Sequence, residues 1–158
     1  MIKILFICHG NICRSPMAEF ILKDLVSKEK LEDKIYVESC ATSTEELGNA
    51  VYPPVYKLLS EYGIDCSKKR ARKIKKEDYD NFDLLVAMDN ENLYNLNRMF
   101  DDKMNKIHLL LSFARIDKEI ADPWYTRDFN KTWDEIMTGC KELLVFIKQE
   151  MLWNIQIF

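Results

Sequence analysis

Glycine, proline and long apolar runs are all scarce in this sequence. Four glycines and four prolines in 158 residues are typical of a globular chain rather than a repetitive or low-complexity one. No apolar run approaches the roughly 20 residues of a membrane span, and the first apolar run is too short for a secretory signal. We therefore expect no membrane association and one domain, 1–158, long enough to bury a full core.

Histidine is rare and the net charge is small. His9 and His108 are the two histidines, and without a His-x-x-Glu-His pattern the sequence predicts no metal site. A net charge of −3 argues against a general nucleic-acid binder, which needs clustered cations. A basic run at 68–73 is typical of a solvated loop, with attraction of an acidic partner as the alternative. Five cysteines, an odd number without framework spacing, indicate reduced thiols and a cytoplasmic location.

Residues 8–16 carry the most informative chemistry. The segment before them, 2–7, is apolar nearly throughout and predicts a strand buried on both faces. The segment after them, 17–26, has apolar residues at helical spacing, with Pro16 in the first turn and Ser15 as the expected cap. A loop between a strand and a helix N-terminus directs backbone N–H groups at one point. Such a point binds anions, phosphate above all.

Cys8 and Arg14 decide what this loop does with an anion. A thiol at a helix N-terminus has a lowered pKa because the N–H dipoles stabilise the thiolate, and the Arg14 fork suits two phosphate oxygens at once. Five residues separate the two, enough for the backbone to curl round a tetrahedral oxyanion. Gly10 and Asn11 can take the left-handed conformations that such a curl needs. We therefore expect Cys8 to be a thiolate nucleophile.

Strand and helix patterns alternate through the rest of the chain. We predict strands at 35–41, 82–88 and 106–110, helices at 55–62 (ended by Gly63), 90–100 and 133–147, a loop at 45–54 broken by Pro53 and Pro54, and a long connection at 111–130. This order implies an α/β fold: a single-domain, doubly wound, open parallel sheet of four strands with helices on both faces and the phosphate-binding loop after the first strand. Ligands of such sheets bind beyond the carboxyl ends of the strands.

Two elements of the chain resemble one known family. Cys8-x-Gly10-Asn11-Ile12-Cys13-Arg14-Ser15-Pro16-x-Ala18-Glu19 is similar to the signature of the low-molecular-weight protein tyrosine phosphatases. Asp122-Pro123-Trp124-Tyr125 resembles the family's Asp-Pro element, and related segments stand at 39–43, 48–49, 63–64 and 88–93. The resemblance extends through about residue 151. The apolar tail, 152–158, lies outside it and is expected to pack either on the domain or on a second copy.

The resemblance implies a phosphoric monoester hydrolase that acts on phosphotyrosine in proteins through a cysteinyl-phosphate, without a cofactor. Cys8 would attack phosphorus, Arg14 would bind the equatorial oxygens, and Asp122 would act as general acid and then as general base. Ser15 resembles the residue that hydrogen-bonds the thiolate, and Asn11 the one that fixes the loop's shape. Inorganic phosphate or other oxyanions would bind as product or inhibitors to the phosphate-binding loop, His9, Gly10, Asn11, Ile12, Cys13, Arg14 and Ser15.

The resemblance also implies a cleft for the substrate's phenyl ring, lined by Ile12, Trp124 and Tyr125. Family members often have an aromatic residue at the position of Glu45, after a Gly where this chain has Thr44, so one wall is expected to be missing or acidic. Lys69 stands where relatives often have a His that supports the loop Asn. Because a Lys donates hydrogen bonds but cannot accept them, we expect activity with an altered substrate preference.

The family pattern further implies that Cys13 traps oxidised Cys8 as a reversible disulfide. Inert packing of Cys13 is one alternative, and a metal-site fragment made with Cys8 and His9 is another. Cys40, Cys66 and Cys140 are expected to be small core residues.

Other functions stay open. Relatives that hydrolyse phosphoarginine carry Thr where this chain has Ile12, whose branched bulk favours an aryl ring. Arsenate reductases share the loop but use additional cysteines after the third strand, and 89–100 contains none. A non-catalytic oxyanion-binding or redox-sensing module would have no need of Asp122. The chain is expected to be a monomer or a weak homodimer.

Overall fold

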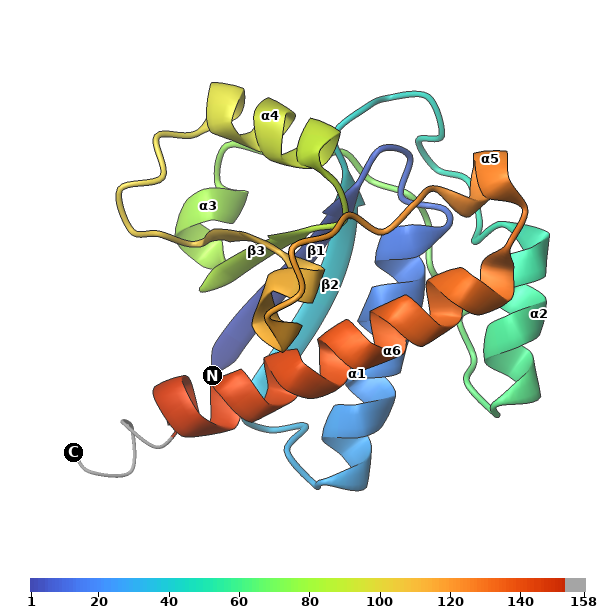
Figure 1. The fold of residues 1–158 in the computed structure, drawn as a ribbon, viewed down its shortest axis with the longest axis horizontal. Coiled ribbons are helices and arrows are strands. Elements are labelled where there is room, and N and C mark those ends of the chain that lie inside the picture. The colour runs from blue at the N-terminus through green and yellow to red at the C-terminus, as the bar shows by residue number, and fades with distance from the viewer. Residues whose placement is uncertain (153–158) are drawn as a thin grey trace.

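The computed structural model describes residues 1–152. A four-stranded parallel sheet lies between two layers of helices (Figure 1), in the strand order β2-β1-β3-β4. The strands are β1 (Ile2–Cys8), β2 (Ile35–Ala41), β3 (Leu84–Ala87) and β4 (Ile107–Leu109). The predicted doubly wound α/β fold is confirmed.

The helices alternate with these strands. They are α1 (Arg14–Lys28), α2 (Pro53–Glu61), α3 (Asp78–Asn81), α4 (Asn90–Met99), α5 (Pro123–Thr126) and α6 (Phe129–Phe146), with a 3-10 helix at Leu110–Ala114 and a π-helical end at Ile147–Leu152. Within residues 1–152, no helix combines the length and the apolarity that crossing a bilayer requires.

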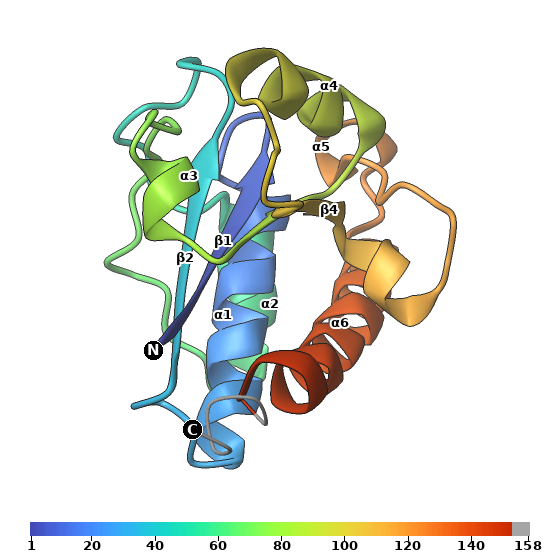
Figure 2. The same cartoon turned by 90° about the vertical axis from the view of Figure 1, so that its left-hand side faces the viewer.

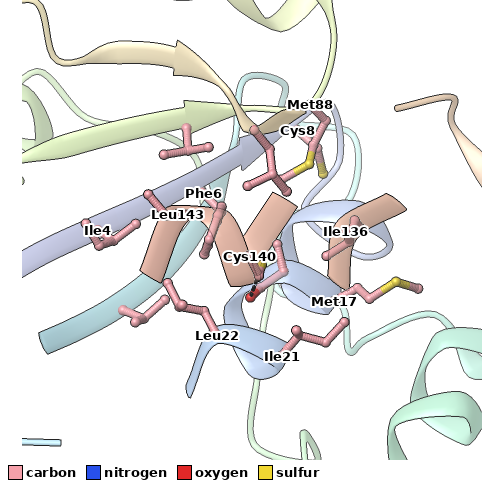
Figure 3. Close-up of a cluster of buried hydrophobic side chains, with 14 of the residues drawn as sticks. Ile4, Phe6, Cys8, Met17, Ile21, Leu22, Met88, Ile136, Cys140 and Leu143 are labelled. Carbon is pink, nitrogen blue, oxygen red and sulfur yellow. Dashed lines mark hydrogen bonds between the residues drawn. The ribbon is translucent and has the colours of Figure 1, made fainter. Parts of the chain in front are cut away.

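Strand β1 is the centre of the core because its side chains alternate between the two layers. Ile4, Phe6 and Cys8 face a cluster with α1, α2 and α6, whereas Leu5 and Ile7 face a cluster with α3 and α4. Figure 2 shows the same layers from the side, and Figure 3 shows the first cluster closing around the carboxyl half of β1. A strand buried on both faces explains why 2–7 is apolar nearly throughout.

The predictions that rested on Pro53, Pro54 and Ser15 were wrong, whereas the one at Gly63 was correct. Pro53 and Pro54 begin α2 instead of breaking a loop, because a proline in the first helical turn loses no helical hydrogen bond. Gly63 does end this helix, with φ +75°. Ser15 is not a cap: α1 begins at Arg14, its cap position is Cys13, and no side chain caps it.

Other boundaries also differ from the predicted ones. The last helix begins at Phe129 rather than 133, because the Asp128 side chain caps it by accepting from the Lys131 N–H at 3.0 Å. The third and fourth strands are shorter than predicted, and the short α3 was not predicted. Of the apolar tail, Leu152 packs against the core, and 153–158 lie outside the described residues.

The sheet has a topological switch point between β1 and β3. From β1 the chain first extends the sheet on one side to β2, then crosses to the other side to β3. Connections that leave two neighbouring strands in opposite directions open a crevice at their carboxyl ends. Cys8 ends β1 and Asp89 follows β3, so both stand at this crevice.

Candidate active site

Hydrogen-bond donors converge on the sulfur of Cys8. The Ser15 hydroxyl oxygen lies 2.9 Å from Cys8 Sγ, and the backbone N–H groups of Asn11 and Ser15 point at it from 3.3 and 3.4 Å. Cys8 itself is only 3% exposed. The predicted strand–loop–helix segment thus curls its backbone around one sulfur atom, in an arrangement that stabilises negative charge there.

Asn11 holds this curl from inside. Its φ of +61° is left-handed, as predicted, and its side-chain NH₂ donates to Ser15 Oγ at 2.8 Å and to Ser39 Oγ at 2.9 Å. Ser15 Oγ accepts from Asn11, and its single hydrogen has two acceptors in reach, Cys8 Sγ at 2.9 Å and the Cys40 carbonyl at 3.5 Å. Gly10 does not adopt a positive φ. A Cβ at Gly10 would lie 3.3 Å from Glu46 Cγ, so the glycine allows a close approach instead.

The hydrogen-bond chain continues from Asn11 to a buried carboxylate. Ser39 Oγ donates to Glu19 Oε1 at 2.6 Å, and Glu19 is 3% exposed. Lys23 and Lys69 pair with Glu19 at 2.5 and 3.4 Å, and Lys69 Nζ also donates to the Ser39 carbonyl at 2.8 Å. Lys69 therefore reaches the loop Asn through Glu19 and Ser39. The sequence did contain one indication of this role for Glu19, because a charged residue stands at a position of α1 that the helical pattern buries.

Arg14 closes the loop and is fixed in three directions. Its Nη1 donates to Asp89 Oδ2 at 2.6 Å and to the Ile120 carbonyl at 2.9 Å, and its Nη2 lies 3.5 Å from Asp122 Oδ2. Burial alone would lower the pKa of Arg14, but the negative charges of Cys8, Asp89 and Asp122 raise it. Asp89, which also caps α4 in a capping box with Asn92, was singled out in the sequence only through a related segment.

Asp122 lies beside Arg14 and lines the same pocket as Cys8. Its Oδ1 accepts from the Trp124 N–H at 3.0 Å and so caps α5, which leaves Oδ2 facing Arg14. The side chain is 25% exposed. One carboxylate oxygen is thus anchored by the Asp-Pro turn, while the other is directed into the pocket.

A pocket of about 140 Å³ opens over Cys8. Glu45 lies in its wall together with Trp124 and Tyr125, and Glu46 adds a carboxylate that was not predicted. Glu45 Oε2 lies 3.0 Å from His9 Nε2 at the rim. The complete lining comprises Cys8, His9, Gly10, Ile12, Cys13, Arg14, Glu45, Glu46, Asp122, Trp124 and Tyr125.

Tyr52 contacts both sides of the pocket. Its backbone N–H donates to the Ile12 carbonyl at 2.9 Å, and its ring lies 4.8 Å from that of Trp124, centroid to centroid. Arg127 Nη1 donates to the Tyr52 hydroxyl at 3.1 Å from the far side of α5. Sequence reasoning missed Tyr52 and Arg127, since neither belongs to a recognised motif.

The other cysteines differ from Cys8 in their surroundings. All five cysteines are free thiols. Burial, together with the negative charges of Cys8 and Asp122, raises the pKa of Cys13, and burial raises the pKa of Cys40, Cys66 and Cys140. Within residues 1–152, no group of three or more His, Cys, Asp or Glu side chains is arranged to hold a metal ion.

Fold and site together define a class of protein. A cysteine sulfur surrounded by N–H donors, with a guanidinium beside it and a carboxylate opposite, is suited to nucleophilic attack on a bound oxyanion. The class is that of enzymes that hydrolyse phosphoric monoesters.

Comparison with known proteins identifies the family. The model of the family described as low molecular weight phosphotyrosine protein phosphatase matches residues 3–152. The chain is 40% identical over 155 residues to the low molecular weight protein-tyrosine-phosphatase YfkJ of Bacillus subtilis, covering 95% of this chain and 98% of the relative. It is also 40% identical over 155 residues to the low molecular weight phosphotyrosine protein phosphatase of Mus musculus, covering 90% and 93%.

Solved structures agree with this assignment. The crystal structure of YfkJ from Bacillus subtilis matches with a TM-score of 0.92 at 38% identity, covering 96% of this chain and 97% of that one. The structure of DARP, a Drosophila arginine phosphatase, matches with a TM-score of 0.86 at 34% identity, covering 94% and 99%. The chain belongs to the low molecular weight phosphotyrosine protein phosphatase family.

Proposed function

We propose that this chain hydrolyses phosphotyrosine in proteins through a cysteinyl-phosphate intermediate. Residues 1–158 act as one phosphatase domain in the cytoplasm, as a monomer or a weak homodimer. Inorganic phosphate and other oxyanions bind the loop from His9 to Ser15 as product or inhibitors. The reaction needs no cofactor, because the nucleophile, the anion-binding groups and the proton donor are all side chains or peptide groups of this chain.

In the first step the Cys8 thiolate attacks phosphorus in line with the phenolic oxygen. The sulfur–phosphorus bond forms as the phosphorus–oxygen bond breaks, and Asp122 gives its proton to the departing oxygen. Arg14 and the loop N–H groups bind the equatorial oxygens, whose charge is the main target of stabilisation in phosphoryl transfer. The position of Asp122 Oδ2 at the pocket, 3.5 Å from Arg14 Nη2, supports this role.

In the second step a water molecule attacks the phosphocysteine. Asp122, now a carboxylate, takes a proton from the water, and the sulfur–phosphorus bond breaks to release phosphate. Cys8 leaves as a thiolate, and the hydroxyl of Ser15 donates to it. The 2.9 Å contact between Ser15 Oγ and Cys8 Sγ supports Ser15 as the donor in this step, because a thiolate can only accept.

The convergence of three donors on Cys8 Sγ is the observation that carries this proposal. We expect Cys8→Ser to abolish hydrolysis of p-nitrophenyl phosphate, because a serine hydroxyl at neutral pH is a far weaker nucleophile than a thiolate. The variant should still bind inorganic phosphate through Arg14 and the loop N–H groups, which equilibrium binding of phosphate measures. Hydrolysis that survives in Cys8→Ser contradicts the covalent route.

Phosphoarginine is the second candidate substrate. The carboxylates of Glu45 and Glu46 line the pocket and would attract the positive charge of a phosphorylated guanidinium, whereas the bulk of Ile12 favours an aryl ring. The likeness to an arginine phosphatase supports testing it. We expect kcat/KM for a phosphotyrosine peptide to exceed that for matched phosphoarginine and phosphoserine peptides, with arsenate reduction assayed alongside; the opposite order would favour the second candidate.

Cys13 is proposed to protect Cys8 from irreversible oxidation. A sulfenic acid on Cys8 condenses with the Cys13 thiol, forming the disulfide and releasing water, and a dithiol later reduces it. Peroxide-treated wild type should regain full activity with dithiothreitol, while Cys13→Ser should stay inactive in proportion to the peroxide dose. Equal recovery of the two proteins would remove Cys13 from this role.

A further inference from the structure

A second cleft, which we call the α4 cleft, adjoins the active-site pocket. It has a volume of about 440 Å³ and lies between residues 42–43, residues 73–74 and one face of α4. His9 lines both the α4 cleft and the pocket over Cys8. Apart from His9, the proposed hydrolysis uses no group of the α4 cleft, so the composition of this cleft needs a separate explanation.

The α4 cleft combines an apolar floor with exposed cations. Ile74 and Leu96 are 4% and 1% exposed, whereas Lys73 and Arg98 are exposed at its edges. Among the ion pairs formed within residues 1–152, none involves Lys73 or Arg98. Two cations without carboxylate partners at one cleft attract an anion.

Thr42 also lines the cleft, but its hydroxyl oxygen is buried, so the cations remain the groups that can meet a bound anion. Glu91 is the acidic residue of the cleft; it stands seven residues before Arg98 on α4, about 10 Å away along the helix axis.

We propose that the α4 cleft binds an anionic side chain of the protein substrate while the phosphotyrosine occupies the pocket over Cys8. This inference rests on the proposed function. The first turn of α4 follows Asp89, which contacts Arg14, so a substrate chain that leaves the pocket over His9 runs along α4 from Glu91 toward Arg98. About three extended residues span that length. The anionic side chain therefore stands about three to five residues from the phosphotyrosine.

Phosphotyrosine peptides with one charged position test this inference. In an alanine background, glutamate or phosphoserine is placed singly at each position from two to six residues before or after the phosphotyrosine. We expect kcat/KM to rise about three- to tenfold over the alanine peptide at positions three to five on one side, as for two exposed ion pairs. The gain should shrink between 50 and 500 mM salt. The phosphoserine series shows whether a second phosphate is preferred to a carboxylate.

Charge reversal locates the effect in the α4 cleft. Lys73→Glu combined with Arg98→Glu should remove the gain and should prefer lysine at the same peptide position. Lys141→Glu is the matched control, since Lys141 is exposed on α6 in the opposite helix layer; it should keep the wild-type preference. All these variants should hydrolyse p-nitrophenyl phosphate at the wild-type rate.

The outcomes distinguish failure of this inference from failure of the proposed function. If no peptide position gives a gain, if the double variant keeps the gain, or if Lys141→Glu loses it equally, the α4 cleft is not the anion site. If the wild type does not hydrolyse p-nitrophenyl phosphate, the proposed function fails instead.

Discussion

Cys8 and Cys140 lie in the same buried cluster (Figure 3), yet different groups surround their sulfur atoms. Cys8 Sγ has three hydrogen-bond donors within 3.4 Å. Cys140 has apolar neighbours, and its thiol donates to the Ala18 carbonyl across 3.7 Å; burial raises its pKa. Both residues are almost inaccessible to solvent, at 3% and 0% exposure. Burial therefore does not separate a nucleophile from a packing residue, whereas the peptide and hydroxyl groups around the sulfur do.

The largest expected effect is on kcat, when the proton donor is removed and the hydrogen bonds to the Cys8 sulfur are kept. Asp122→Asn removes the proton donor but no donor to Cys8, so kcat for phenyl phosphate should fall about 10²–10⁴-fold. Iodoacetate should alkylate Cys8 in this variant at close to the wild-type rate. Asp117→Asn, an exposed change in the same connection, is the control. An unchanged kcat in Asp122→Asn would exclude Asp122 as the general acid.

A smaller effect is expected when one donor to the sulfur is removed. Ser15→Ala deletes the hydroxyl 2.9 Å from Cys8 Sγ and should lower kcat about 10- to 10²-fold, since a hydrogen bond to a charged group is worth about 1.5–3 kcal/mol. The second step should slow most, because the thiolate is its leaving group. Trapping of phosphocysteine by rapid quench measures this. Ser27→Ala on the exposed end of α1 should leave kcat unchanged; an equal kcat in Ser15→Ala would mean that the N–H groups suffice.

The smallest expected effect is on the pH dependence of stability, and it comes from the Cys140 thiol, which has no donors around its sulfur among the residues that the structure describes. Because burial raises the pKa of Cys140 above its ordinary value of 9.0, the native protein keeps a proton there that the unfolded chain loses in alkali. The stability linked to this thiol is complete below about pH 9 and is lost as the pH rises, by about 1.4 kcal/mol per pH unit. Urea unfolding at pH 7, 9 and 10 should show a shallower decline for Cys140→Ala than for the wild type. If the free energy of unfolding falls equally with pH in the two proteins, burial does not keep the Cys140 thiol protonated, and the contrast with Cys8 fails.

Local signals in the sequence predicted the fold and the Cys8 loop well. Apolar runs located all four strands, and the order of residues from Cys8 to Pro16 was sufficient to place a curl before a helix. The errors at Ser15 and at Pro53-Pro54 have one cause: each residue type suits two roles, cap or helix interior for serine and breaker or first turn for proline. Tertiary contacts decide between such roles.

Long-range partners of the site could not be predicted. Asp89 reaches Arg14 across 75 positions of sequence and Ser39 reaches Glu19 across 20, and neither pair has a local pattern. Lys69 is the clearest example of a partner that its sequence position did not predict. Relatives often have at its position a His that supports the loop Asn, whereas the Lys69 side chain pairs with Glu19 and donates to the Ser39 carbonyl.

Tyr52 has a consequence for how the enzyme tolerates its substrates. A peptide hydrogen bond joins it to Ile12 at the phosphate end of the site, while only rings and one guanidinium join it to Trp124 and Arg127 at the mouth. Rotation of side chains can therefore widen the entrance without shifting any peptide group that surrounds the anion. The width of the entrance and the geometry of the anion-binding loop are therefore set by separate groups of contacts.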